Sequence, residues 1–250
     1  MIVDFDLYNT LFCGQSFCWR KEKNDYVAIL NNKVYRLNNQ SDITDPFLIK
    51  YLDMDFNYEK ALEDLKKMDD RFIDIIDKCG QLHILKQDLW ETVLSFILSQ
   101  NNNIKRIEGL YDSFCRNFGL EIEKGYYSFP RPDDLIHLSE QDLRDLRVGF
   151  RAPYILDAIQ NSDKILEVNK KDEKEGEDIL LSIKGIGPKV SSCIRLFALH
   201  QLNAFPKDVW IKKVMQKEFS NKTEKDFYPL AGLAQQYMFH YARLGYFNNI

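Results

Sequence analysis

The sequence lacks the features that would place the chain in a membrane or mark it for secretion. No stretch comes near the ~18 consecutive apolar residues that a membrane-spanning helix needs. The first residues, Met1 to Asp6, contain neither a basic segment nor an apolar core, so no secretory signal peptide is expected. The sequence therefore predicts an intracellular protein that does not contact a membrane.

Cysteine is scarce, and its positions form no recognisable pattern. The number of cysteines is odd and their spacing is scattered, which argues against a disulfide framework and against a Cys-x-x-Cys zinc site. They also form no four-cysteine motif of the kind that holds an iron–sulfur cluster. We therefore expect neither a metal site nor an iron–sulfur cluster. The five cysteines are Cys13, Cys18, Cys79, Cys115 and Cys193.

Excess positive charge, the usual mark of a nucleic-acid-binding protein, is missing as well. The net charge is −4, which weakly opposes such a function. The charge is unevenly distributed, however, because acidic residues concentrate at 53–77 and 171–178 while region 184–213 contains a single acid, Asp208. The basic residues of that region form either a local DNA-binding face or a merely solvated one, and composition favours neither. They are Lys184, Lys189, Arg195, Lys207, Lys212 and Lys213.

The hydrophobic patterning predicts an α+β protein. Short β-rich runs at 16–20, 26–30 and 33–37, with Asn31-Asn32 as a turn, indicate a small antiparallel sheet over roughly the first 40 residues. From about residue 45 the spacing becomes helical. We divide the chain into 1–88, the sheet with associated helices, and 89–250, a helical body. Helices are expected at 104–118, 133–147, 152–167, 177–183, 188–200, 208–219 and 229–244, with a charged surface loop at 168–178.

A glycine-rich turn joins the two helices of region 177–200. Gly185 and Gly187 permit a tight reversal and leave backbone N–H groups bare. Those groups and the N-terminus of the next helix, including the N–H of Val190, make a phosphate site that needs no charged side chain. Such a helix–hairpin–helix holds a DNA backbone without reading its sequence. The alternative is a simple turn between two helices that glycine closes.

Lys189 lies in the first turn of the second of these helices. The positive end of the helix dipole disfavours its charged form there, and a neutral amine is what a nucleophile requires. Cys193, four residues on, shares a helix face with Lys189. Asp208 follows at the start of another predicted helix. Taken singly, Lys189 is more simply a surface lysine and Asp208 an N-cap.

Five sequence blocks, in order along most of the chain, resemble the helix–hairpin–helix DNA glycosylases that have a Gly/Pro-rich loop and a distal aspartate. Region 185–194 (GIGPKVSSCI) with 205–209 (FPKDV) is similar to the 8-oxoguanine branch, whose members also cut the strand at abasic sites. The other blocks are 13–20 (CGQSFCWR), 95–107 (SFILSQNNNIKRI), 149–154 (GFRAPY) and 230–239 (LAGLAQQYMF). The resemblance implies a small sheet followed by a helical body of this type.

The resemblance assigns roles to residues that would act on an extruded base. Lys189 would attack C1′ and form a Schiff base, and Asp208 would stabilise the developing charge on the sugar. The carbonyl of Gly14 would accept N7–H of 8-oxoguanine, a hydrogen that guanine lacks. Phe239 would stack on the base with Cys193 on its other side, while Gln235 would bind its Watson–Crick edge.

On the duplex, Asn101 would fill the space that the base leaves and Phe150 would wedge beside it. Arg106 and Arg151 would contact the cytosine opposite. The simpler interpretations are a capping asparagine, a turn glycine at Gly14, a core phenylalanine at Phe239 and two solvated arginines. The sequence departs from the family's animal members at Phe150, where they carry tyrosine, and at Trp210, where they carry histidine, which puts a polar role at the latter position in doubt.

The expected partner is double-stranded DNA containing 8-oxoguanine, bound by a monomer. No cofactor should be required, although the sequence leaves open whether the hairpin carbonyls hold a cation. Two alternatives remain. One is a related helix–hairpin–helix glycosylase for a different damaged base, and the other is a non-catalytic DNA-binding module.

Overall fold

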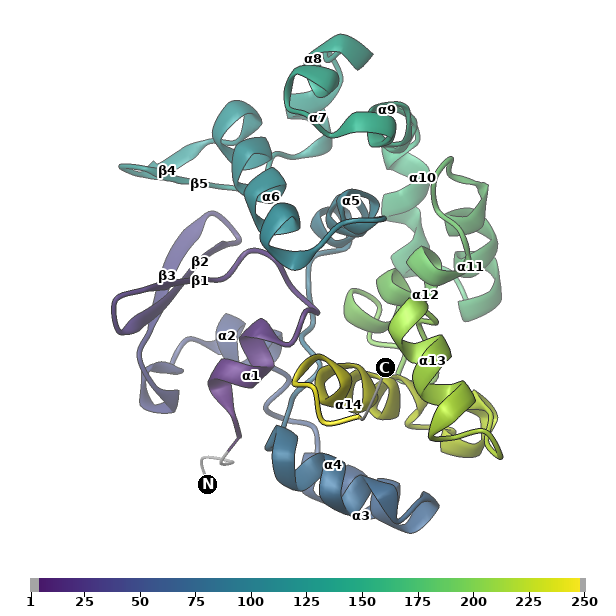
Figure 1. The fold of residues 1–250 in the computed structure, drawn as a ribbon. Coiled ribbons are helices and arrows are strands. Elements are labelled where there is room, and N and C mark those ends of the chain that lie inside the picture. Colours follow the sequence, from purple (N-terminus) through teal and green to yellow (C-terminus); the bar gives the residue numbers. More distant parts are fainter. Residues whose placement is uncertain (1–4, 248–250) are drawn as a thin grey trace.

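The structure, a computed structural model, describes residues 5–247. Its N-terminal half contains a three-stranded antiparallel sheet of order β1-β2-β3 (Figure 1). The strands are β1 (Arg20–Glu22), β2 (Asp25–Leu30) and β3 (Lys33–Leu37). Asn31 and Asn32 both have positive φ, 48° and 57°, as a tight hairpin turn requires. The predicted hairpin is therefore present.

Two details of the N-terminal prediction are wrong. Residues 7–12 belong to a helix, α1 (Leu7–Phe12), which Asp6 caps by accepting from the N–H of Asn9. The run 16–20 is also not a strand, since only Arg20 belongs to β1. Its apolar side chains are buried because they pack into the core rather than lining a sheet, and Trp19 Nε1 donates to the hydroxyl of Tyr51 at 3.1 Å.

The helical spacing after residue 45 corresponds to α2 (Pro46–Tyr51), α3 (Tyr58–Met68) and α4 (Arg71–Cys79). Next, α5 (Leu89–Ser99) and α6 (Ile104–Phe118) follow, the latter with the predicted bounds. A second small sheet, β4 (Glu121–Glu123) with β5 (Tyr126–Tyr127), was not predicted. Short 3-10 helices lie at η1 (Gln40–Asp42), η2 (Gly149–Arg151), η3 (Val168–Lys170) and η4 (Glu224–Phe227).

Two long predicted helices are each divided in the structure. Region 133–147 forms α7 (Pro132–Leu135) and α8 (Glu140–Asp145), because Ser139 caps a new helix by accepting from the N–H of Asp142. Region 152–167 forms α9 (Ala152–Gln160) and α10 (Ser162–Glu167), with the break at Asn161. The apolar spacing predicted that these regions are helical, but it did not predict the breaks within them.

The last helices are α11 (Glu173–Ser182), α12 (Pro188–Phe197), α13 (Val209–Lys217) and α14 (Ala231–Arg243). The loop predicted at 168–178 is therefore wrong. Asp172 accepts from the N–H of Glu175 at 2.8 Å and starts α11 inside that charged segment. Pro229 does not begin α14, whose N-cap is Leu230.

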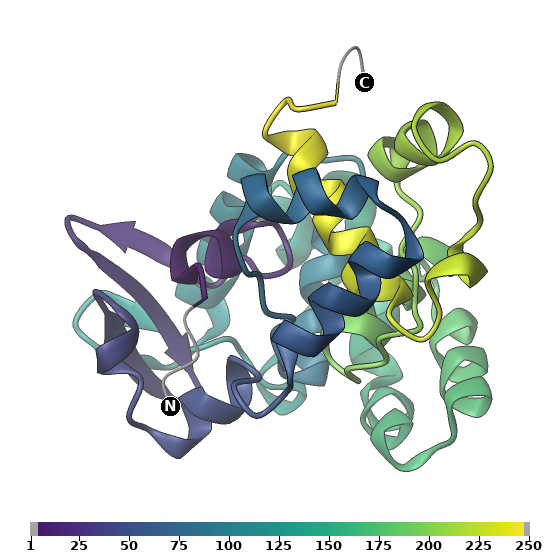
Figure 2. The same ribbon diagram turned by 90° about the horizontal axis from the view of Figure 1, so that it is seen from below.

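Helix α14 closes the fold by returning to the first half of the chain. It packs against α4 and α13, and Figures 1 and 2 show it between the N-terminal elements and the second half. The hydroxyl of Tyr237 on α14 accepts from the N–H of Leu82 at 2.8 Å and donates to the carbonyl of Gly80 at 3.0 Å. The residues after Gly80 form no helix or strand up to α5, yet Leu82, Ile84 and Leu85 are fully buried. In the described part of the chain, no helix combines the length and apolar character that crossing a membrane takes.

Candidate active site

The helix–hairpin–helix consists of α11, the turn 183–187 and α12. Gly185 has φ +88°, and a Cβ there would lie 2.4 Å from Cγ of Tyr154, so both backbone and space require glycine. Its carbonyl accepts from Nε2 of Gln100 at 2.9 Å. A Cβ on Gly187, by contrast, would meet nothing within 4 Å. The turn is thus packed against Tyr154 and Gln100 at Gly185, whereas the space beside Gly187, at the N-terminus of α12, is free.

No side chain caps the start of α12, where Gly187 is the N-cap residue. The N–H groups of the first turn are therefore available to an anion such as a phosphate. Val190 is 4% exposed, so only its backbone can take part. The first helix of the hairpin begins at Glu173, earlier than the predicted residue 177, and α12 ends at Phe197 rather than at residue 200.

Lys189 lies in the first turn of α12 and is half-buried. Its Nζ lies 5.3 Å from the centre of the Phe96 ring, and its charge acts to lower the pKa of the Cys193 thiol, one turn further along. Burial raises the pKa of the Cys193 thiol, so that thiol stays neutral beside the amine. Within residues 5–247 the amine of Lys189 forms no ion pair. A primary amine is thus presented at the hairpin with a neutral neighbour.

Asp208 is the N-cap residue of α13, as predicted, and its Oδ1 accepts from the N–H of Ile211 at 2.8 Å. Burial raises the pKa of Asp208, while the Ile211 N–H and the charge of Lys189 act in the opposite direction. The electrostatic influence of Lys189 reaches both Asp208 and Cys193, so the structure brings these three residues together.

Gly14 and Phe239, which are far apart in the sequence, meet in the structure. Gly14 has φ +92°, and a Cβ on it would lie 3.1 Å from Cε1 of Phe239 and 3.4 Å from Cδ1 of Ile104. Gln236 Nε2 donates to the carbonyl of Cys13 at 3.1 Å and ties α14 to this loop. A side chain at Gly14 would require Phe239 to shift by a few tenths of an ångström, and the positive φ of Gly14 itself favours glycine.

Gln235 lies one turn before Phe239 on α14 and is 4% exposed. Its Oε1 is buried and has no hydrogen-bond partner among the residues that the structure describes. An unpaired buried acceptor costs free energy, about 1–3 kcal/mol, unless a ligand satisfies it. Gln235 therefore offers an amide group that is ready to bind a polar edge.

The wedge candidates lie near the end of α5 and on η2. Asn101 has φ +51° and is exposed, and Phe150 is 49% exposed. The interpretation of Arg151 as a solvated arginine is wrong, because it is 3% exposed and donates to the carbonyls of Val148, at 3.0 Å, and Gln100. Arg106 is exposed, and within the described residues its side chain donates to the carbonyl of Arg147, at 3.5 Å.

Gln100 connects this wedge region to the hairpin. Its carbonyl accepts from Arg151, and its side chain donates to Gly185. Gln100 was not among the predicted site residues, and neither were Gln236 and Arg243, which lie beside the loop of Gly14. Nothing in the sequence distinguishes these three from other polar residues, because their roles arise from contacts between distant segments.

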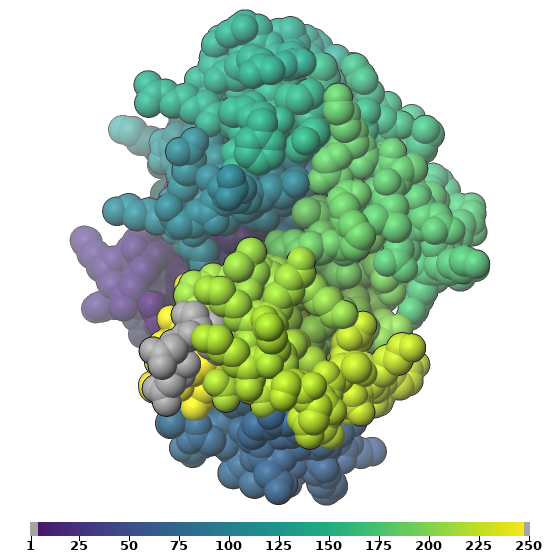
Figure 3. Space-filling model, turned by 45° about the vertical axis from the view of Figure 1, so that its right-hand side comes forward, coloured from purple at the N-terminus to yellow at the C-terminus, as the bar shows by residue number. Residues whose placement is uncertain are grey.

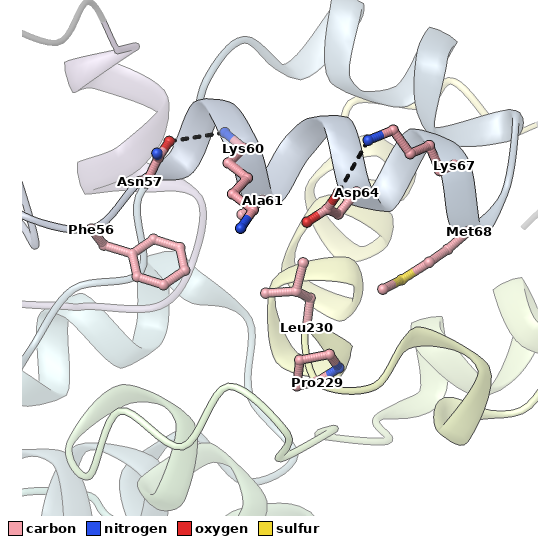
Figure 4. A pocket seen from close by; sticks show the side chains of 9 residues that line it. All are labelled: Phe56, Asn57, Lys60, Ala61, Asp64, Lys67, Met68, Pro229 and Leu230. Atoms are coloured by element: carbon pink, nitrogen blue, oxygen red, sulfur yellow. Dashed lines mark hydrogen bonds and ion pairs between the residues drawn. The ribbon is translucent and has the colours of Figure 1, made fainter.

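Figure 3 shows the face of the molecule where these elements meet. Green α12 and yellow-green α13 border a hollow on one side, the blue-green surface of α6 and the residues just before it borders it on the other, and purple N-terminal residues are visible at its floor. A different pocket, of about 500 Å³, lies between α3 and the start of α14 (Figure 4). It is lined by Phe56, Ala61 and Leu230 among others and contains none of the candidate site residues.

In the described part of the chain, the side chains that could bind a metal ion or an iron–sulfur cluster do not lie close together. No three His, Cys, Asp or Glu side chains there are placed to hold a metal ion. All five cysteines are free and buried.

Comparison with known proteins agrees with this arrangement. Residues 2–93 match the N-terminal domain of 8-oxoguanine DNA glycosylase, and residues 94–228 match the HhH-GPD superfamily of base excision DNA repair proteins. The N-glycosylase/DNA lyase of Saccharomyces cerevisiae is 28% identical in an alignment 263 positions long. The alignment covers 88% of this chain and 70% of the yeast protein.

Two solved structures are similar over nearly the whole chain. MBOgg1 in complex with a low-affinity DNA ligand is 33% identical with a TM-score of 0.90, covering 98% of this chain and 94% of that one. The Clostridium acetobutylicum 8-oxoguanine glycosylase/lyase, in complex with DNA containing cytosine opposite 8-oxoguanine, is 30% identical with a TM-score of 0.85, covering 97% and 93%. The chain therefore belongs to the HhH-GPD superfamily of base excision DNA repair proteins, in the branch that carries the N-terminal domain of the 8-oxoguanine DNA glycosylases.

Proposed function

We propose that the protein removes 8-oxoguanine from double-stranded DNA and then nicks the strand at the resulting abasic site. The observation that carries this proposal is the grouping of Lys189 with Cys193 and Asp208 at the hairpin. The similarity to the Clostridium acetobutylicum glycosylase/lyase supports the choice of lesion. The enzyme would act as a monomer, inside the cell and associated with DNA.

Lesion recognition would use the groups that meet at Gly14. The Gly14 carbonyl would accept N7–H of 8-oxoguanine, whereas guanine would place an acceptor against that carbonyl. A pair of facing acceptors disfavours guanine by about 1–3 kcal/mol. Phe239 would move from its contact with Gly14 to stack on the base, and Gln235, whose Oε1 has no partner in the described structure, would bind its Watson–Crick edge. Buried Cys193 would contact the other face of the base.

The chemistry would begin when the Lys189 amine attacks C1′ as the glycosidic bond breaks and its electron pair leaves with the base. The Asp208 carboxylate would stabilise the positive charge on the sugar and take up the proton that the amine loses. The proton held by Asp208 then passes to O4′ as the C1′–O4′ bond opens, which gives a protonated Schiff base. The base that left with its electron pair can accept the C2′ proton. Loss of this proton expels the 3′ phosphate, so base removal and strand nicking share one covalent intermediate.

The duplex would be held by phosphate contacts to the N–H groups of Gly185, Gly187 and Val190. Asn101 would replace the extruded base, with Phe150 as a wedge beside it. None of these steps calls for a cofactor. Hairpin carbonyls could also hold a cation next to the phosphate, but that of Gly185 already accepts a hydrogen bond from Gln100.

Borohydride trapping tests the proposed function, because it reduces a Schiff base to a stable covalent link. We expect a covalent complex with a duplex containing 8-oxoguanine opposite cytosine and none with the matching undamaged duplex. Equal binding to both duplexes without trapping would favour a non-catalytic DNA-binding module. Trapping confined to duplexes with another damaged base would favour a different glycosylase specificity.

The two arginines of the wedge region should set the preference for cytosine opposite the lesion. The donors of exposed Arg106, and those of Arg151 once they leave the carbonyls of Val148 and Gln100, suit the O2 and N3 acceptors of cytosine, whereas adenine offers a mismatched pattern. Changing both Arg106 and Arg151 to methionine should bring the excision rates opposite the four bases to within about threefold of one another, since one charged hydrogen bond accounts for about 1.5–3 kcal/mol. The measurement is single-turnover excision from four duplexes.

Arg106→Met and Arg151→Met should also be compared singly. Only the Arg151 change removes the partner of the buried Val148 carbonyl and of the half-buried Gln100 carbonyl, so it alone should lower the Tm. Arg144→Met is a matched control, because Arg144 is exposed and forms an ion pair with Glu140 on the same helix. Rates that keep their wild-type ratios in the double variant would show that these arginines do not read the opposite base.

A further inference from the structure

Arg243 lies at the end of α14, one turn beyond Phe239, and approaches the loop of Gly14. A Cβ placed on Gly14 would lie 3.0 Å from Nη1 of Arg243 and 3.1 Å from Cε1 of Phe239. The guanidinium carbon lies 5.7 Å from the centre of the Phe239 ring. Arg243 is therefore adjacent to both residues that would contact the extruded base at this point.

The guanidinium of Arg243 has donors to spare. It carries five N–H donors, and its hydrogen bond within residues 5–247 is a weak one from Nη1 to the carbonyl of Phe12 at 3.5 Å. Glu108 interacts with it electrostatically but forms no ion pair with it in the described structure. Loss of hydration lowers the pKa of Arg243, although more than a third of the residue is open to solvent. The charged guanidinium of Arg243 is thus accessible to solvent, and within the described residues most of its N–H donors have no hydrogen-bond partner.

We propose that Arg243 is a further specificity-determining residue, whose guanidinium donates a hydrogen bond to the C8 carbonyl oxygen of the extruded oxidised purine. This inference rests on the proposed function. In 8-oxoguanine, N7–H lies between the carbonyl oxygens at C8 and C6. When the Gly14 carbonyl accepts N7–H, these two acceptors lie on either side of it, within the neighbourhood that Arg243 occupies.

The chemistry on the other sides of Gly14 supports this assignment. Ile104 and Phe239, the other residues nearest to a Cβ placed on Gly14, offer no hydrogen-bond donor, and the Nε2 of Gln236 is already bonded to the carbonyl of Cys13. The Gly14 carbonyl alone would detect N7–H, whereas a donor beside it would also detect the oxygen that oxidation adds at C8. Together they would match the donor and acceptor pattern of an oxidised purine with a C8 carbonyl, which an undamaged purine lacks.

The test compares Arg243→Met and Arg243→Lys with the wild type on two substrates. One is a duplex with 8-oxoguanine opposite cytosine, and the other is the same duplex with a preformed abasic site, which has no base to recognise. We expect Arg243→Met to lower single-turnover excision by about 10- to 100-fold, the range for a lost charged hydrogen bond. Cleavage at the abasic site should stay within about twofold of wild type, and lysine should restore part of the excision rate.

Arg116→Met is the matched control, since Arg116 is exposed at the far end of α6 and pairs with Asp112. It should leave both rates within about twofold of wild type, because exposed pairs contribute little. Equal losses on both substrates for Arg243→Met would instead indicate a phosphate contact or a structural role and overturn the proposal, as would an unchanged excision rate. If the wild type fails to release 8-oxoguanine at all, the proposed function fails, and this result is distinct from those outcomes.

Discussion

Lys189→Gln is expected to abolish both borohydride trapping and base excision. Glutamine keeps most of the side chain's length and its packing near Phe96, but it has no nucleophilic amine. Without the attack on C1′ the covalent intermediate cannot form, so we expect the excision rate to fall by about 10³-fold or more, or roughly 4 kcal/mol in activation free energy. Single-turnover assays and trapping on the 8-oxoguanine duplex measure this directly.

Binding separates this loss from misfolding. Lys189→Gln should retain affinity for the lesion duplex, because the N–H groups of the hairpin and the contacts around Gly14 are unchanged. Lys184→Gln removes a charge from the same turn and is the matched control, which should still be trapped, with a modest loss of affinity at most. Persistent strand cleavage by the Lys189 variant would mean that another amine is the nucleophile.

Asp208→Asn should lower the excision rate by about 10²- to 10⁴-fold, the range for losing a proton-transfer group, without lowering stability. Asparagine is as good an N-cap as aspartate, so the bond from the Ile211 N–H is kept. Burial raises the pKa of Asp208, which means that its ionised form opposes folding at every pH above that raised pKa. Removing this charge should leave the Tm unchanged or raise it by a few degrees.

The pH dependence provides a second measurement on Asp208. The proposed role requires the carboxylate, so wild-type excision should fall as the pH drops through the raised pKa of this group. The loss of excision activity at low pH should begin at a higher pH than it would if an exposed aspartate were responsible. The residual activity of Asp208→Asn should not show this loss. A lower Tm for this variant would show that the native charge stabilises the fold, contrary to the role proposed here.

The parts of this structure that depend on local sequence could be predicted. Asn31-Asn32 indicated the β2–β3 hairpin, and α6 has its predicted bounds because Asn103 caps its start and Gly119 ends it. Lys189 and Cys193 share a face because they are one helical turn apart. The residue type and position of Asp208 were enough to predict its cap.

What could not be predicted depends on contacts between distant segments. The charged stretch at 168–178 resembled a loop, but Asp172 starts a helix there whose apolar face packs on α12. The meeting of Gly14 with Phe239 and the burial of Arg151 leave no periodic signal, because neither partner is near the other in sequence. The division of the chain at residue 88 and the individual roles of the site residues stay predictions.

The return of α14 onto the first half of the chain bears on how the molecule unfolds. Tyr237 bonds the backbone on both sides of Gln81, and Gln236 holds Cys13, so the helix that carries Gln235 also completes the core of the N-terminal half. A truncation before Ala231 would leave the apolar residues after Gly80 uncovered, and it would remove the partner of the Leu82 N–H and of the Gly80 carbonyl. Such a shortened chain would be degraded or aggregate rather than persist as a DNA-binding protein that has merely lost its selectivity.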